Sequence, residues 1–116
     1  MIMNRLVTDS GVMIVFPTEM GNYHYLKPIG RGSSSVVILV ENKINHDLFS
    51  AKLLKRDKYI DKNFERELRF LQRKVKHPNI IPVYDILYFE ETIAVIMEYC
   101  PRGDLVSMLS KQGRFD

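Results

Sequence analysis

The amino-acid sequence predicts an α+β fold, and three observations support this prediction. Three strand-like apolar runs come first, a helical repeat of apolar residues follows, and two further strand-like runs come after it. Turn-forming residues separate these segments, so each of them is short. The chain has 116 residues, which is enough for one small domain with its core but not for two domains.

The five predicted strands are apolar runs bounded by Gly, Pro, Asn or Asp. They cover residues 23–29, 36–41, 48–54, 80–89 and 92–99. Pro28 is expected at a strand edge or a bulge, because it lacks the N–H that a ladder needs. The Asn and Asp residues within 42–47 predict a turn. The apolar run 12–16, before the first strand, predicts either an added strand or a segment packed on the main sheet.

One main helix is predicted between Asp61 and His77, the residue before Pro78. Its apolar residues recur at steps of four, three and four and form one stripe: Phe64, Leu68, Leu71 and Val75. A second, short amphipathic helix is predicted from the spacing of Leu105, Met108 and Leu109.

Composition excludes several classes of protein. The chain is 46% apolar and 27% charged, as an ordinary globular chain is. Its net charge of +3 is too small to indicate nucleic-acid binding, and no apolar run approaches the roughly 20 residues that span a bilayer, so no membrane partner is expected. The single cysteine, Cys100, excludes an internal disulfide and fits a reducing, cytoplasmic location. His24 has no second metal ligand at a suitable spacing, so no metal site is predicted.

Residues 29–37 combine glycines and serines between two predicted strands. Glycine can adopt positive φ and lets the backbone approach a ligand, and successive N–H groups in such a turn can bind phosphate oxygens. A Walker A loop is excluded because no Gly-Lys follows, and a dinucleotide-binding loop is disfavoured because a strand rather than a helix follows. A plain hairpin turn without a ligand remains the alternative.

Two charged residues stand in apolar surroundings. Lys52 lies inside an apolar run, where burial is costly without a partner, so it either has a buried partner or faces water through strand alternation. Glu67 lies at the border of the helix stripe. Its carboxylate either turns inward toward a buried cation or is solvated among the neighbouring arginines.

Together these residues resemble the amino-terminal lobe of a protein kinase over residues 23–116, which leaves residues 1–22 as an N-terminal extension. The matching motifs are Gly30-x-Gly32-x-x-Ser35-x-Val37 for the glycine loop, Phe49-Ser-Ala-Lys52 for the third-strand lysine, Glu67 for its helix C partner, His77-Pro-Asn-Ile-Ile for the following turn, Ile96-Met-Glu-Tyr-Cys for the hinge, and Asp104 for the acidic residue beyond it. Within the family, the hinge and the residues after it resemble serine/threonine kinases of the calmodulin-dependent-kinase-like group, including the testis-specific serine kinases.

The resemblance implies a kinase-like lobe: a five-stranded antiparallel sheet with one main helix (helix C), then the hinge and the first helix of the second lobe. It also implies ATP as the ligand. The implied ATP-binding residues are Ile29, Gly30, Gly32, Ser35, Val37, Ser50, Lys52, Met97, Glu98, Cys100 and Asp104, with Glu67 as the partner of Lys52. Met97 stands at the gatekeeper position. Ser35 and Ser50 depart from the usual glycine and alanine of the family.

The groups that complete catalysis in this family do not occur in the 116 residues. Neither the catalytic loop with its Asp nor the Asp-Phe-Gly magnesium site is present, so Mg²⁺ and a protein substrate are expected only for a full-length domain. The chain by itself is therefore expected to be inactive in phosphoryl transfer. Two alternatives stay open: a non-catalytic half-kinase that binds a partner, and a fragment produced by an incomplete gene prediction.

Overall fold

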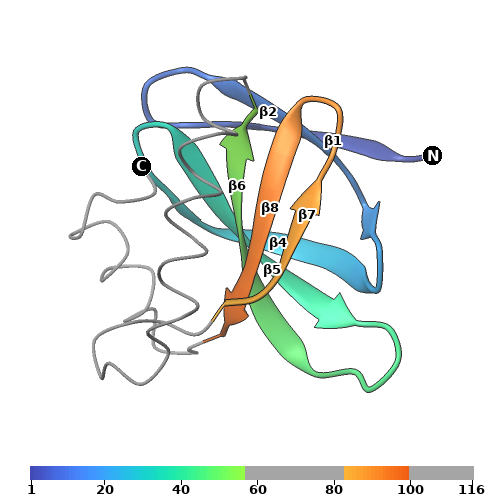
Figure 1. Ribbon diagram of the computed structural model, residues 1–116. Helices are drawn as coiled ribbons and strands as arrows, with labels where there is room; N and C mark the ends of the chain where they lie inside the picture. The colour runs from blue at the N-terminus through green and yellow to red at the C-terminus, as the bar shows by residue number, and fades with distance from the viewer. Residues whose placement is uncertain (57–82, 100–116) are drawn as a thin grey trace.

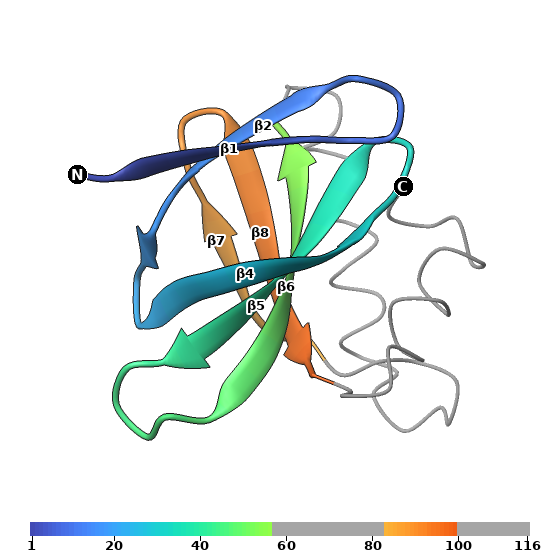
Figure 2. The same ribbon diagram turned by 180° about the vertical axis from the view of Figure 1, so that it is seen from behind.

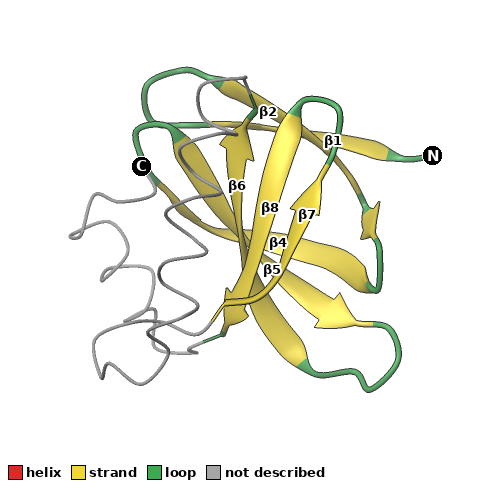
Figure 3. Ribbon diagram, in the orientation of Figure 1, coloured by secondary structure: helices red, strands yellow, loops and turns green. Residues whose placement is uncertain are grey.

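Strands and their connecting turns make up the part of the chain that the structure describes. The computed structural model describes residues 1–56 and 83–99. Within these ranges the chain forms a two-stranded hairpin and a six-stranded sheet, as Figures 1 and 3 show. All strand pairs are antiparallel.

The strands follow one another in a simple order. They are β1 (Met3–Val7), β2 (Met13–Pro17), β3 (Glu19–Met20), β4 (Tyr23–Arg31), β5 (Ser35–Asn42), β6 (Leu48–Lys55), β7 (Val83–Tyr88) and β8 (Thr92–Glu98). In the larger sheet the spatial order is β3-β4-β5-β6-β8-β7, so β5 and β6 are central.

The β1–β2 hairpin lies across one face of the larger sheet. It passes behind β6 and β8 in Figure 1 and in front of the sheet in Figure 2. Ile14 and Phe16 of β2 are completely buried and pack into the main core. The prediction for the apolar run 12–16 is therefore confirmed in both of its forms, because the run adds a strand and also packs on the sheet.

The buried core lies between this hairpin and the sheet. Strand alternation places every second residue of a strand on the same face. On the face toward the hairpin, the core residues of β5, β6 and β8 are Val36, Ile38, Val40, Ala51, Leu53, Ala94 and Ile96. The alternate residues of the same strands lie on the opposite face, where they form a separate set.

The predicted number of strands in the sheet was wrong. Five strands were expected, and the sheet has six because β3 pairs with the start of β4. Gly21 has a φ of 60°, which favours glycine, and it allows the chain to reverse within the two residues between β3 and β4. The helix predicted between Asp61 and His77 and the short helix near Leu105 lie outside the described residues.

Two local predictions are confirmed. The pairing of β4 with β5 is irregular between Pro28 and Gly30, so Pro28 borders a bulge. The Asn42 side chain accepts hydrogen bonds from the N–H groups of Ile44 (2.9 Å) and Asn45 (3.3 Å), and the Asn45 side chain accepts one from Asp47 (3.0 Å). This is the turn chemistry expected of Asn.

Candidate functional site

Several of the predicted site residues share the face of the sheet opposite the hairpin. Val37 pairs with Lys52, and Lys52 pairs with Val95, so these residues form a row across β5, β6 and β8. Directly opposed residues of antiparallel strands project to the same face. Gly30 of β4 extends the row by pairing with Val37, and it adds no side chain there.

A second row lies beside the first, two residues away from it on each strand and farther from the glycine loop. Ser50 pairs with Leu39 on one side and with Met97 on the other. All three side chains are buried. None of them belongs to the core cluster beneath the hairpin. We call the two rows (Val37, Lys52 and Val95; Leu39, Ser50 and Met97) the site face.

Lys52 is the one charged residue among the buried residues that the structure describes. Its relative exposure is 1%, and its two partners in the row are valines. The alternative in which strand alternation turns Lys52 toward water is therefore wrong. Burial of an ammonium group is tolerated only with polar or charged partners. Glu67, its predicted partner, lies outside the described residues.

The glycine loop is a tight hairpin between β4 and β5. The Gly32 N–H donates to the Ser35 carbonyl at 2.8 Å, which leaves Ser33 and Ser34 as the two residues of the turn. Among the described glycines only Gly11 and Gly21 have positive φ, so Gly30 and Gly32 do not use the positive φ that glycine allows. Ile29 lies within the irregular part of β4, and Ser35 is buried at the start of β5.

The turn between β1 and β2 contacts this loop, which the sequence reasoning missed. The Asp9 N–H donates to the Gly32 carbonyl at 3.0 Å, and the Ser10 hydroxyl donates to the Ser33 carbonyl. A signal for the turn was present, because Asp9, Ser10 and Gly11 are turn-forming residues between two apolar runs. Nothing in the sequence indicates which distant segment the turn would contact.

At the end of β8 a buried residue is followed by an exposed one. Met97 is 1% exposed and lies on the site face, whereas its neighbour Glu98 is exposed. Cys100 and Asp104, the other residues predicted near the hinge, lie outside the described residues. The structure thus brings Val37, Ser50, Lys52 and Met97 together on one face, with the glycine loop at the end of the neighbouring strand pair.

The sequence of this chain matches the model of a known protein family. Residues 23–116 match the model of the protein kinase domain. The chain belongs to the protein kinase family. The match begins at the first residue of β4, so in this kinase-family chain the β1–β2 hairpin and β3 precede the matched region.

Relatives of this chain include serine/threonine kinases of plants. This kinase chain is 35% identical to the serine/threonine-protein kinase SRK2C of Arabidopsis thaliana over 96 residues, which are 83% of the chain. It is 36% identical over 93 residues (80% of the chain) to SAPK3 of Oryza sativa subsp. japonica. It spans 28% of the length of each of these relatives.

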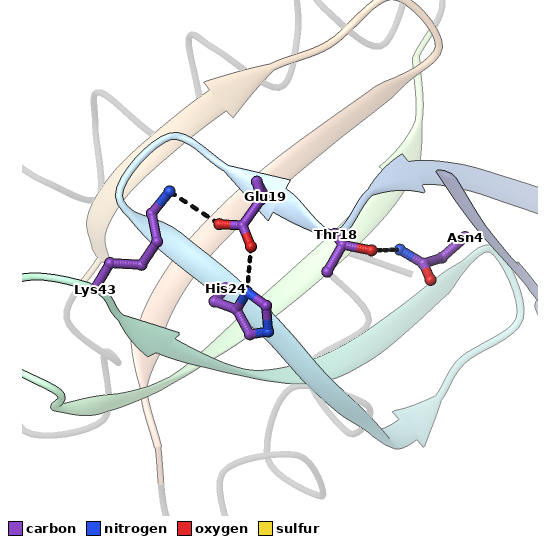
Figure 4. Close-up of polar contacts among 5 residues, drawn as sticks. All are labelled: Asn4, Thr18, Glu19, His24 and Lys43. Carbon is purple, nitrogen blue, oxygen red and sulfur yellow. Dashed lines mark hydrogen bonds and ion pairs between the residues drawn. The ribbon is translucent and has the colours of Figure 1, made fainter. Parts of the chain in front are cut away.

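A polar cluster lies on the kinase chain where β3 meets β4 (Figure 4). The Glu19 carboxylate contacts the Lys43 ammonium at 2.9 Å and the His24 ring nitrogen. The hydrogen bond from Lys43, followed by that from His24, lowers the pKa of Glu19 below its usual range. His24 is a partly exposed side chain that contacts Glu19.

The described residues contain neither a metal-binding cluster nor a helix that could span a membrane. Within residues 1–56 and 83–99, no three His, Cys, Asp or Glu side chains gather closely enough to bind a metal ion. The same ranges contain no helix of the length and apolar character that a membrane span requires.

Proposed function

We propose that this chain of the protein kinase family binds ATP on the site face. The observation that carries the proposal is the burial of Lys52 on this face, in a row of apolar residues and opposite the main core. A buried ammonium group requires polar or anionic partners, and the phosphate oxygens of a nucleotide have the chemistry to be among them.

The residues around Lys52 suit the two halves of a nucleotide. Val37, Leu39 and Met97 provide apolar surface for a purine, and Ser50 provides a hydroxyl between Leu39 and Met97. Lys52 lies one row closer to the glycine loop than Ser50 does. The purine would therefore lie along the row of Ser50 and the phosphates toward Lys52 and the loop, as the family resemblance implies.

Removal of the Lys52 ammonium tests this proposal. We expect Lys52→Ala to weaken binding of a fluorescent ATP analogue to the chain by at least about tenfold, because the phosphates lose a buried, charge-assisted contact. Lys55→Ala is the matched control, since Lys55 belongs to the same strand but is exposed. It should leave the affinity within about twofold of wild type.

Thermal unfolding of each variant shows whether it is folded at the assay temperature. Unchanged nucleotide affinity in folded Lys52→Ala would overturn the proposal. Equal weakening by Lys52→Ala and Lys55→Ala would also contradict it, because it would indicate a general effect of charge rather than a site.

The activity of a whole kinase is a wider proposal. We propose phosphoryl transfer from ATP to serine or threonine of a protein, with Mg²⁺ as the metal ion, only for a protein in which the site face is joined to a catalytic loop. The plant serine/threonine kinases among the relatives support the serine/threonine class. They give no support to the narrower calmodulin-dependent or testis-specific subgroup. The cytoplasmic location stays a proposal from the single cysteine.

The alternative of a non-catalytic binding module depended on apolar surface at Leu105, Met108 and Leu109. These residues lie outside the described ranges, so no structural observation favours that function over ATP binding.

A further inference from the structure

We propose that the β1–β2 turn positions the glycine loop and directs two backbone N–H groups of that loop, those of Ser33 and Ser34, toward the nucleotide phosphates. This inference rests on the proposed binding of ATP. It assigns a role to residues 9 and 10, which precede the region that matches the kinase domain.

Two hydrogen bonds join the turn to the loop. The Asp9 N–H donates to the carbonyl of Gly32 at 3.0 Å, and the Ser10 hydroxyl donates to the carbonyl of Ser33. Consecutive carbonyl groups of the loop are therefore both engaged by the hairpin. One contact comes from the backbone and the other from a side chain, so a substitution of Ser10 can remove the second contact and leave the first. The same hydroxyl also lies 3.2 Å from the Thr8 hydroxyl within the turn.

The turn that makes these contacts is well ordered by its own hydrogen bonds. The Thr8 N–H donates to the Val12 carbonyl at 2.8 Å, and the Val12 N–H donates to the Thr8 hydroxyl at 3.0 Å. The Thr8 carbonyl accepts a hydrogen bond from the Gly11 N–H at 3.0 Å. Gly11 has a φ of 89°, which side chains rarely adopt, so the turn depends on glycine there. Thr8 itself is buried.

Peptide geometry determines where the loop N–H groups point. In a planar trans peptide, the C=O of one residue and the N–H of the next point in opposite directions. No cis peptide bond occurs among the described residues. Because the Gly32 and Ser33 carbonyls point toward the hairpin, the N–H groups of Ser33 and Ser34 point away from it. Two successive N–H groups with a shared direction can bind an anion.

The position of the hairpin is itself fixed relative to the site face. Ile14 and Phe16 hold the hairpin in the core on the opposite face of the sheet, and the buried Thr92 hydroxyl of β8 donates to the Val15 carbonyl at 2.6 Å. The loop is thus tied to the strands that position Lys52. Ordering the loop before the nucleotide binds lowers the entropic cost of binding.

Removal of the Ser10 hydroxyl tests the inference. We expect Ser10→Ala to weaken binding of a fluorescent ATP analogue roughly three- to tenfold, the effect of one lost hydrogen bond. Ser10→Thr should restore affinity because it keeps the hydroxyl. Asn4→Ala is the matched control: it removes a hydrogen bond of the same hairpin, from Asn4 Nδ2 to Thr18 Oγ1 at 2.8 Å (Figure 4), without touching the loop.

Amide hydrogen exchange of the nucleotide-free chain separates this inference from the proposed function. Ser10→Ala should speed exchange at the Asp9 and Gly32 N–H groups, and Asn4→Ala should not. Unchanged exchange, or unchanged nucleotide affinity in Ser10→Ala, would overturn the positioning role. Faster exchange in a chain whose wild type binds no ATP analogue would support the contact between turn and loop, and it would refute ATP binding instead.

Discussion

At the scale of one residue, Lys52 is a charged side chain buried in a row of apolar residues. Its flanking partners in the row are Val37 and Val95, and its exposure is 1%. A charged group in such surroundings costs several kcal/mol unless partners compensate for its lost hydration. Its ammonium group therefore needs polar or anionic partners, and under the proposed function the nucleotide phosphates are among them.

Thr92 is a residue at which a buried hydroxyl stabilises the fold. Its side chain is completely buried and donates to the Val15 carbonyl at 2.6 Å, which joins β8 to the hairpin. Thr92→Val keeps the shape but removes the donor, so we expect the free energy of unfolding to fall by about 1–3 kcal/mol. Urea denaturation measures this change.

The matched variant is Thr92→Ser, which keeps the hydroxyl and should cost less than Thr92→Val. A Thr92→Val chain as stable as wild type would show that the bond between β8 and the hairpin contributes nothing to the fold.

At the scale of elements, the β1–β2 hairpin is part of the same packing unit as the sheet. Ile14 and Phe16 belong to one buried cluster with residues of β5, β6 and β8. Tyr23 of β4 belongs to the same cluster, and Phe16 makes an edge-to-face contact with Tyr25 of β4 at a centroid distance of 5.0 Å. Side chains from residues 1–22, which the sequence analysis treats as an extension, are therefore part of the core.

The Glu19 cluster gives the elements around β3 a defined pH dependence. Lys43 and His24 hold the pKa of the Glu19 carboxyl below its ordinary value of 4.5. A carboxyl whose pKa is lower in the folded chain stabilises the fold above the unfolded pKa, and this contribution is lost as pH falls through the folded pKa. Wild type should therefore lose stability relative to Glu19→Gln as the pH falls below about 4.5.

Melting temperatures of both chains between about pH 7 and about pH 3 test this expectation, and the two curves should converge at the acid end. Glu90→Gln, a change at another exposed glutamate, is the control for general acid destabilisation. A constant difference between wild type and Glu19→Gln over the whole range would contradict the lowered pKa.

Across the whole molecule, sequence reasoning predicted the strands that have a clear apolar pattern. The five expected strands occur as β4 to β8, because each is long enough to show alternation or a continuous apolar run. It missed β3, which has only two residues and so no periodicity, and it did not predict that β2 would pair with β1. Contacts between Ser10 and the glycine loop depend on packing between distant segments, which no local pattern encodes.

The same limit applies to the site. The resemblance to kinases selected Val37, Ser50, Lys52 and Met97, and the register of β5, β6 and β8 places them on one face. The sequence by itself does not predict whether Lys52 is buried or exposed, because strand alternation does not tell which face of a sheet is covered. Its burial emerges only when the strands are paired and both faces are packed.

The 116-residue chain is not expected to catalyse phosphoryl transfer by itself. Phosphoryl transfer requires a group that orients the attacking hydroxyl and metal ions that neutralise the transferring phosphoryl group, as well as a bound nucleotide. The 116 residues contain no counterpart of the family's catalytic Asp or of its magnesium site. We therefore expect this chain to bind an ATP analogue without measurable phosphotransfer to a generic protein substrate in the presence of Mg²⁺. Turnover that Lys52→Ala abolishes would contradict this expectation, because it would show that the site face is sufficient for catalysis.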